Sequence, residues 1–263
     1  MNPWLLWTEP LQLPTYFTLL MTGFALATFV LRDEALARGV PPRVVMDAAL
    51  RVLPAVLIGA RLFHVVLEEP AAYLRDPWSA LSPAGGWVFY GGLAAGVLVL
   101  RRFVRSQPGL SLWTLADCFA PAVAFGLVFG RLGCLGAGCC HGRPADWPLG
   151  VEVPWSIVYY RPGRLPEALL GVPVHPTPIY EGALCLGLYA ALSRYGRRWP
   201  PGATALTFFG AYGLGRAFIE LFRGDVMRGL WLGGWLSTSQ IIGLVTGGMS
   251  LALVWRMTRV RSH

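Results

Sequence analysis

The stretch LWTLADCFAPAVAFGLVFGRLGCLGAGCCHG, residues 112–142, joins a long apolar run to a glycine-rich end. Within the run, residues 112–135, the only charged side chains are Asp117 and Arg131. The hydrocarbon core of a bilayer is crossed by a helix of about 20 apolar residues. The run therefore predicts a transmembrane helix that ends beside three cysteines and a histidine.

The composition of the whole chain is that of an integral membrane protein. Of its 263 residues, 55% are hydrophobic and 14% are charged, which argues against a soluble domain. A net charge of +8 suggests nucleic acid in a soluble protein, but here the arginines cluster between apolar segments, where they orient a membrane chain. We therefore expect no nucleic-acid partner. The start of the chain, MNPWLLWTEPLQLP, lacks a basic region and a small-residue cleavage site, so no removable signal peptide is predicted.

Seven stretches are long and apolar enough to predict membrane-spanning helices. They are residues 13–31, 44–67, 86–100, 112–135, 176–192, 203–222 and 238–255. Twelve arginines lie in the first, third and fifth connections and the C-terminal tail, against six on the opposite side. The positive-inside rule then predicts a cytoplasmic C-terminus and an outer N-terminus. The predicted fold is an all-α integral membrane protein with seven transmembrane helices, forming one transmembrane domain over residues 1–263.

The longest connection, residues 136–175, falls on the predicted outer face. It contains six prolines and four interfacial aromatic residues, namely Trp147, Trp155, Tyr159 and Tyr160. Such a segment cannot span a bilayer, and its aromatics suit the membrane interface. We expect a small outer-face cap between the fourth and fifth helices.

Charged residues inside the predicted spans indicate a polar interior. There are eight: Asp47, Arg51, Arg61, Asp117, Arg131, Glu181, Arg216 and Glu220. Each costs about 2.5 to 3.5 kcal/mol at a helix centre, so such residues usually face a cavity and pair. Guanidinium binds phosphate through two donors at once and stays charged in a low dielectric. We therefore expect Arg61, Arg131 and Arg216 to converge on one anionic lipid headgroup.

Several segments resemble the prolipoprotein diacylglyceryl transferase family and occur in that family's order. They are GARLFHVV (59–66), YGGLAAG (90–96), DCFAPAVAFGLVFGRLGCLGAGCCHG (117–142), HPTPIYEG (175–182), YGLGRAFIELFRGD (212–225) and LSTSQ (236–240). The resemblance covers nearly the whole chain. It implies a multi-pass enzyme of the bacterial cytoplasmic (inner) membrane that transfers the diacylglyceryl group of phosphatidylglycerol to a cysteine thiol of a prolipoprotein and releases glycerol phosphate.

The resemblance also implies a set of site residues. Arg131 matches the arginine of the family signature, Gly142 its closing glycine, and Glu181 the glutamate before the fifth span. The expected catalytic residues are Arg131, Arg216, Glu220, Tyr90, Cys139 and His141. The expected substrate-binding residues are Arg61, Gly91, Gly92, Cys134, Gly142, Glu181 and Tyr212.

Three departures from the family pattern concern thiol activation. Cys134 stands where the family has asparagine, Cys139 where it has glutamate, and Tyr90 where it has the histidine often assigned as a base. A tyrosine with a pKa of about 10 is a poor base at neutral pH. His141 and His175 border the outer loop and are the histidines placed to replace it. A divergent transferase with another acceptor, or a non-catalytic lipid-binding or transport protein, remains an alternative.

The clustered cysteines have several interpretations. A local disulfide, thiols packed as small hydrophobic groups, a Cys139 nucleophile and a thiolate base are all compatible with the pattern. A zinc site would draw on Cys134, Cys139, Cys140 and His141, but three consecutive ligating residues strain a backbone. We therefore expect no bound metal and no cofactor.

Overall fold

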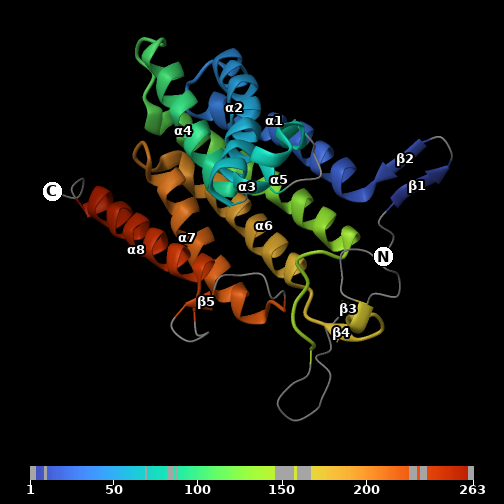
Figure 1. The fold of residues 1–263 in the computed structure, drawn as a ribbon. Coiled ribbons are helices and arrows are strands. Elements are labelled where there is room, and N and C mark those ends of the chain that lie inside the picture. The colour runs from blue at the N-terminus through green and yellow to red at the C-terminus, as the bar shows by residue number, and fades with distance from the viewer. Residues whose placement is uncertain are drawn as a thin grey trace. The chain divides into compact units, whose positions relative to one another are not determined.

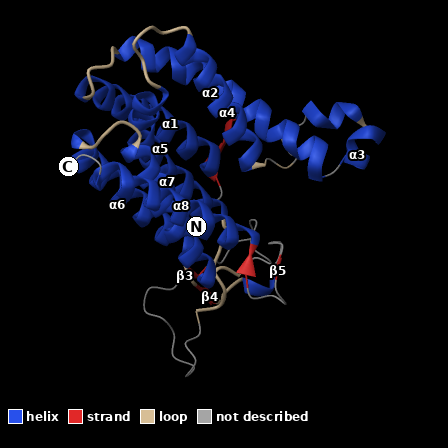
Figure 2. Cartoon of the chain, turned by 90° about the vertical axis from the view of Figure 1, so that its left-hand side faces the viewer, coloured by secondary structure: helices blue, strands red, loops and turns tan. Residues whose placement is uncertain are grey.

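The computed structural model is mainly helical, and its strands are short (Figure 2). It describes residues 4–8, 11–68, 70–81, 86, 88–145, 157–158, 167–224, 230–231 and 236–259. The α-helices are α1 (Thr15–Ala37), α2 (Pro42–Phe63), α3 (Pro70–Arg75), α4 (Phe89–Arg105), α5 (Leu112–Ala137), α6 (Thr177–Tyr195), α7 (Ala203–Ile219) and α8 (Thr238–Arg259) (Figure 1).

Short elements extend or connect these helices. The π-helix η1 (His64–Glu68) continues α2, and the 3-10 helices are η2 (Pro77–Leu81), η3 (Glu167–Leu169), η4 (Gly196–Arg198) and η5 (Glu220–Phe222). Among the described residues, the strands pair as three antiparallel couples: β1 (Trp4–Thr8) with β2 (Leu11–Pro14), β3 (Ile157–Val158) with β4 (Pro173–Val174), and β5 (Leu230–Trp231) with β6 (Leu236–Ser237).

An α-helix occupies most of each of the seven stretches predicted as spans. Four helical segments of the described chain are long and apolar enough to cross a membrane. These are Thr15–Ala37, Pro42–Glu68, Leu112–Ala137 and Thr238–Met257. Helices α4 and α7 have only 17 residues each. It stays a prediction that α4, α6 and α7 also cross the membrane. The orientation of the chain and the outer cap stay predictions as well. The four interfacial aromatics of the predicted cap lie outside the described residues.

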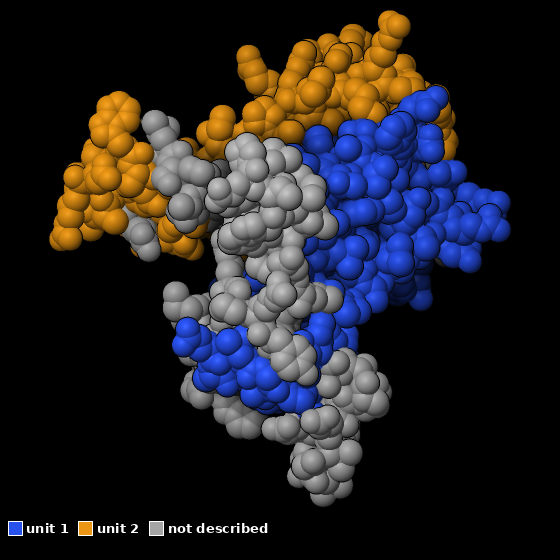
Figure 3. Space-filling model, turned by 90° about the vertical axis from the view of Figure 1, so that its right-hand side faces the viewer, with its two compact units in different colours: residues 1–34, 116–263 blue, residues 35–115 orange. Residues whose placement is uncertain are grey.

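The chain divides into two compact units, residues 1–34 with 116–263 and residues 35–115 (Figure 3). In the first unit, α1 lies along α5, because a Cβ on Gly133 would meet Tyr16 at 3.1 Å and one on Gly126 would meet Ala27 at 3.6 Å. Helix α7 packs on both α6 and α8. A Cβ on Gly213 would lie 3.0 Å from the Gly243 carbonyl oxygen, so small residues set the close approach of α7 and α8.

The second unit is built on the pair α2 and α4. A Cβ on Gly59 would lie 2.6 Å from the Gly91 carbonyl oxygen, and one on Gly92 would lie 2.9 Å from that of Val56. The structure thus places Gly91 and Gly92 where the two helices cross. That position explains both glycines by packing, and their part in substrate binding stays a prediction.

Two buried acidic residues tie segments of the first unit together. The Asp117 carboxylate accepts hydrogen bonds from the backbone N–H groups of Gly202 (2.7 Å) and Ala205 (2.8 Å), which caps the start of α7. Glu34, only 1% exposed, accepts from Arg197 at 2.8 Å. Asp117, predicted only as an intramembrane charge, therefore has a structural role that its sequence position did not indicate.

Helix α8 begins with a reciprocal cap. The Gln240 N–H donates to Ser237 Oγ (3.2 Å), and the Ser237 N–H donates to Gln240 Oε1 (2.8 Å). This is the capping box of a serine followed three residues later by glutamine. Gln240 Nε2 also donates to the Ala217 carbonyl at 3.4 Å, which ties the start of α8 to the end of α7.

Candidate functional site

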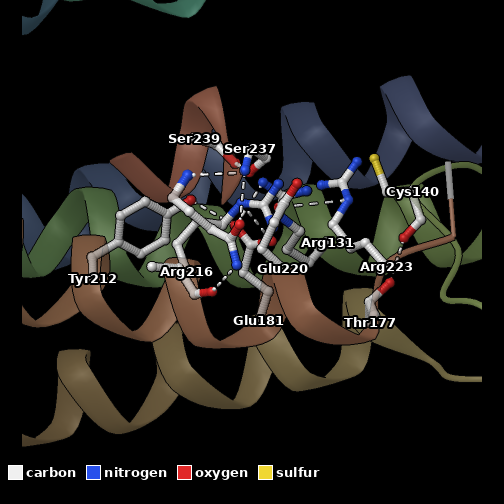
Figure 4. A network of polar contacts seen from close by, with 12 residues as sticks. Arg131, Cys140, Thr177, Glu181, Tyr212, Arg216, Glu220, Arg223, Ser237 and Ser239 are labelled. Carbon is white, nitrogen blue, oxygen red and sulfur yellow. Dashed lines mark hydrogen bonds and ion pairs between the residues drawn. The ribbon is translucent and has the colours of Figure 1, made fainter. Parts of the chain in front are cut away.

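A buried carboxylate joins three helices of the first unit (Figure 4). Glu181, near the start of α6, is 2% exposed. Its Oε1 lies 2.7 Å from Arg131 Nη2 of α5 and accepts a 2.6 Å hydrogen bond from the Tyr212 hydroxyl of α7. Its Oε2 lies 3.7 Å from Arg216 Nε. One carboxylate is therefore shared by two guanidinium groups and a phenol.

The network continues along one face of α7 and η5. Arg216 Nη1 lies 2.8 Å from Glu220 Oε2, and Arg223 Nε lies 3.9 Å from the same oxygen. The spacing of 216, 220 and 223 repeats at about one helical turn, which puts the three side chains on one stripe. Arg223 was predicted only as a loop charge, although its spacing from Glu220 was a readable signal.

Arg131 and Arg216 retain donor capacity beyond their contacts with glutamate. A guanidinium has five N–H donors, and the two groups compete for the single Glu181 carboxylate. Arg216 Nη1 is buried and makes no hydrogen bond of good geometry to any described residue, although it is ion-paired with Glu220. Such donors in a low dielectric suit an anion with several oxygens, such as a phosphate.

Arg61 has different surroundings. Its guanidinium donates to three backbone carbonyls of the second unit, those of Ser79 (2.8 Å), Ala80 (2.9 Å) and Gly86 (3.0 Å). It therefore anchors the segment that follows α3. Its predicted convergence with Arg131 and Arg216, which belong to the first unit, stays a prediction.

The end of α5 brings three cysteines together. Gly138 has a positive φ of 70°, its N–H donates to the Leu135 carbonyl (3.3 Å), and the Cys139 N–H donates to the Cys134 carbonyl (3.1 Å). This is a Schellman turn, which places the residue after the glycine over the last turn of the helix. The sulfur atoms of Cys134, Cys139 and Cys140 all lie within 4.8 Å of one another. The structure forms no disulfide among the five cysteines.

The two cysteines beyond the helix differ electrostatically. Hydrogen bonds from the Cys134 and Cys139 thiols, with the charges of Arg131 and Arg223, hold the pKa of Cys140 far below its ordinary value, although burial opposes this. Hydrogen bonds with Cys134 and Cys140, together with burial, raise the pKa of Cys139. The pKa is therefore displaced in opposite directions at Cys140 and Cys139, and a catalytic part for Cys139 stays a prediction.

His141, Gly142 and His175 lie where three chain segments meet. The Gly142 N–H donates to the His175 carbonyl (2.9 Å), and the Arg143 N–H donates to that of Phe222 (2.9 Å). A Cβ on Gly142 would overlap His175 and lie 2.8 Å from the Phe222 carbonyl, so only glycine fits. Both histidines are buried. His141 Nδ1 lies 3.0 Å from the Gly142 carbonyl, and His175 Nδ1 lies 3.1 Å from the Tyr180 hydroxyl.

Of the other predicted residues, Tyr90 is 43% exposed in the second unit. The structure therefore brings together Arg131, Glu181, Tyr212, Arg216 and Glu220 in one network, with Cys140 of the cysteine cluster at its edge (Figure 4). Tyr90, Gly91, Gly92 and Arg61 belong to the other unit, and their part in the site stays a prediction.

Residues 3–256 match the family model described as prolipoprotein diacylglyceryl transferase. A Geobacter sulfurreducens protein named phosphatidylglycerol–prolipoprotein diacylglyceryl transferase is 34% identical over 238 residues, which is 88% of this chain and 86% of the relative. A Nitrosomonas europaea protein of the same name is 33% identical over 261 residues, covering 94% and 86%. With its long apolar helices, this is a multi-pass bacterial membrane protein, and it belongs to the prolipoprotein diacylglyceryl transferase family.

Proposed function

We propose that this chain is a phosphatidylglycerol-dependent diacylglyceryl transferase of the bacterial cytoplasmic (inner) membrane. Its substrates are phosphatidylglycerol and the cysteine of a prolipoprotein signal peptide, in keeping with the names of its relatives. The acceptor sulfur forms a bond to the glyceryl carbon of the lipid. The bond from that carbon to the phosphate oxygen breaks, and glycerol phosphate leaves with the electron pair.

The shared Glu181 carboxylate is the observation that carries this proposal. It positions Arg131 and Arg216 side by side from two helices while leaving them more donors than it can accept. A phosphate bound there is neutralised before the reaction, and the charge that develops on the leaving phosphate oxygen is stabilised by donors already in place. Tyr212 fixes the carboxylate through its 2.6 Å hydrogen bond.

A transfer assay with the purified full-length protein tests the proposal. Phosphatidylglycerol labelled in its acyl chains is incubated with a lipoprotein signal peptide, and labelled peptide is measured. Loss of one transition-state donor typically lowers a rate by about 10²- to 10³-fold, so Arg131→Ala should lose activity on that scale and Arg131→Lys should recover only part of it. Arg198→Ala is the matched control, because Arg198 is exposed in η4 and outside the network.

Two results would contradict the proposal. Equal transfer by the wild type and Arg131→Ala would remove the phosphate role of the network. No transfer by the wild type, with phosphatidylglycerol still bound in an Arg131-dependent way, would instead favour another acceptor or a non-catalytic lipid-binding protein.

A further inference from the structure

The three thiols at the end of α5 are not explained by phosphate binding. Their sulfur atoms lie within 4.8 Å of one another, Cys134 is buried, and Cys139 and Cys140 are partly accessible. They border the guanidinium network, since Arg131 acts electrostatically on both Cys134 and Cys140. A cluster of three sulfurs beside a substrate site can hold a metal ion that prefers sulfur ligands.

From this cluster we infer that Cys134, Cys139 and Cys140 bind one Zn²⁺ ion through three sulfur ligands and leave its fourth coordination position open for the acceptor thiol. This inference rests on the proposed function, because the acceptor is the cysteine of the prolipoprotein. Catalytic zinc sites have this form, with three protein ligands and one exchangeable position.

The dimensions of the cluster fit the ion. A tetrahedral site with Zn–S bonds of about 2.3 Å separates its sulfurs by about 3.8 Å. The three sulfurs lie within 4.8 Å of one another, so binding requires only a small inward movement of the side chains. Zinc with three thiolates carries one net negative charge, and the guanidinium groups of Arg131 and Arg223 lie where they can offset it.

The backbone shows where the strain of adjacent ligands falls. Cys140 is the one non-glycine residue with positive φ (57°) in the described part of the chain. Its carbonyl is held by the Thr177 hydroxyl at 2.5 Å, and the Schellman turn holds Cys139 over Cys134. A glycine or asparagine would take this conformation at lower cost. A cysteine kept in this unfavourable backbone conformation indicates a functional role for its sulfur, because strained residues of this kind gather at functional sites.

The open coordination position supplies a way to deprotonate the acceptor thiol. Tyr90 occupies the place of the family's histidine and is a poor base at neutral pH. A thiol that coordinates zinc is deprotonated outright, and its proton passes to solvent. The acceptor thiolate then forms the C–S bond while the C–O bond to phosphate breaks. Glycerol phosphate leaves with the electron pair, on the side held by Arg131 and Arg216, and no oxidant or reductant is needed.

Cobalt binding tests the site without relying on activity. The full-length protein is reduced, freed of metal and titrated with Co²⁺, whose thiolate complexes absorb in the near ultraviolet. We expect saturation at one ion per chain. Cys139→Ser and Cys140→Gly should lose this band, and Cys118→Ser should keep it, because Cys118 is a buried thiol of the same helix outside the cluster.

Cys140→Gly keeps the test valid if Cys139→Ser folds poorly. Glycine relieves the positive φ at position 140, so this variant should unfold at no lower temperature than the metal-free wild type. A folded Cys140→Gly protein that still shows the full cobalt band overturns the site. Absence of a cobalt band in the reduced wild type overturns it as well.

The open position is tested with acceptor peptides. A signal peptide containing cysteine should shift the visible bands of bound Co²⁺, and the same peptide with serine should not. Identical spectra with both peptides overturn the open position.

Transfer assays then separate this inference from the proposed function. Removal of the metal should lower transfer about a hundredfold, the scale of a lost catalytic base, and Zn²⁺ should restore it. Full transfer by metal-free protein overturns the zinc role while the proposed function stands. A cobalt band with a cysteine-dependent shift, but no transfer under any condition, supports the thiol site and contradicts the transferase.

Discussion

Replacing Glu181 by glutamine tests the balance of charge in the site. The amide would keep the shape of the side chain and could still accept the hydrogen bond of Tyr212, now 2.6 Å long. It would lose the negative charge that Arg131 meets at 2.7 Å and Arg216 at 3.7 Å. The two guanidinium groups would then face each other across a neutral side chain.

The expected cost follows from burial and distance. Glu181 is 2% exposed, and breaking a buried ion pair from one side costs about 3 to 5 kcal/mol. Tyr212→Phe removes only one hydrogen bond to a charged acceptor, at about 1.5 to 3 kcal/mol. At about 2 to 4 °C per kcal/mol for a chain of this size, Glu181→Gln should lower the unfolding midpoint by on the order of 10 °C, and clearly more than Tyr212→Phe.

The assay is thermal unfolding of the purified variants in one detergent, with and without added lipid. Phosphatidylglycerol should raise the midpoint of Glu181→Gln more than that of the wild type, because its phosphate replaces the missing negative charge. Diacylglycerol is the matched control, since it has the acyl chains without the phosphate.

Two results would refute the reasoning. If Glu181→Gln is no less stable than Tyr212→Phe, the carboxylate does not compensate the two arginines. If diacylglycerol restores stability as well as phosphatidylglycerol does, the arginines do not form a phosphate site.

Three further predictions concern stability. Asp117→Ala should lower the free energy of unfolding by about 2 kcal/mol, because two N–H groups at the start of α7 lose their acceptor. Lipid binding should be unchanged in a co-purification assay. Cys140→Gly should gain about 1 kcal/mol in metal-free protein, and a loss in thermal unfolding would disprove strain there. Burial and the charge of Arg143 lower the pKa of His175 from 6.5, so its contribution is complete above pH 6.5 and is lost as pH falls through the lower folded value. His175→Gln should therefore flatten the fall in unfolding midpoint as the pH drops below 6.5.

Hydropathy was sufficient to locate the helices because it depends on apolar runs alone. It predicted a helix over residues 44–67, and α2 with η1 covers residues 42–68. It could not show that the last turn becomes a π-helix at His64, because that depends on hydrogen-bond spacing. Nor could it settle which of the shorter helices cross the membrane, since α4 and α7 have only 17 residues each.

The candidate site was predictable where side chains bind one another and not where they bind backbone. The pairing of Arg216 with Glu220 follows from their spacing, and the structure has it at 2.8 Å. Arg61 shows no such signal, because its partners are the carbonyls of Ser79, Ala80 and Gly86.

Adjacency in the sequence predicts strain between neighbouring ligands, but it does not show the turn that separates Cys134 from Cys139. Gly138 follows the end of α5 and marks a Schellman turn. That turn returns Cys139 to Cys134, while the strain of neighbouring ligands remains at Cys140, which has a positive φ. Gly138, as a helix terminator, is the sequence signal that predicts the close approach of the three sulfurs.

The backbone contacts around Gly142 hold together the two ends of the segment between Ala145 and Pro173. Two backbone hydrogen bonds join these ends: the Ala145 N–H donates to the Pro173 carbonyl (2.8 Å), and the His175 N–H donates to the Arg143 carbonyl (3.0 Å). Doubling the length of a closed loop costs only about 0.6 kcal/mol. A reporter domain spliced there would leave the arginine network in place, and its compartment-dependent fluorescence or enzyme activity would reveal on which side of the bilayer lipid and acceptor meet.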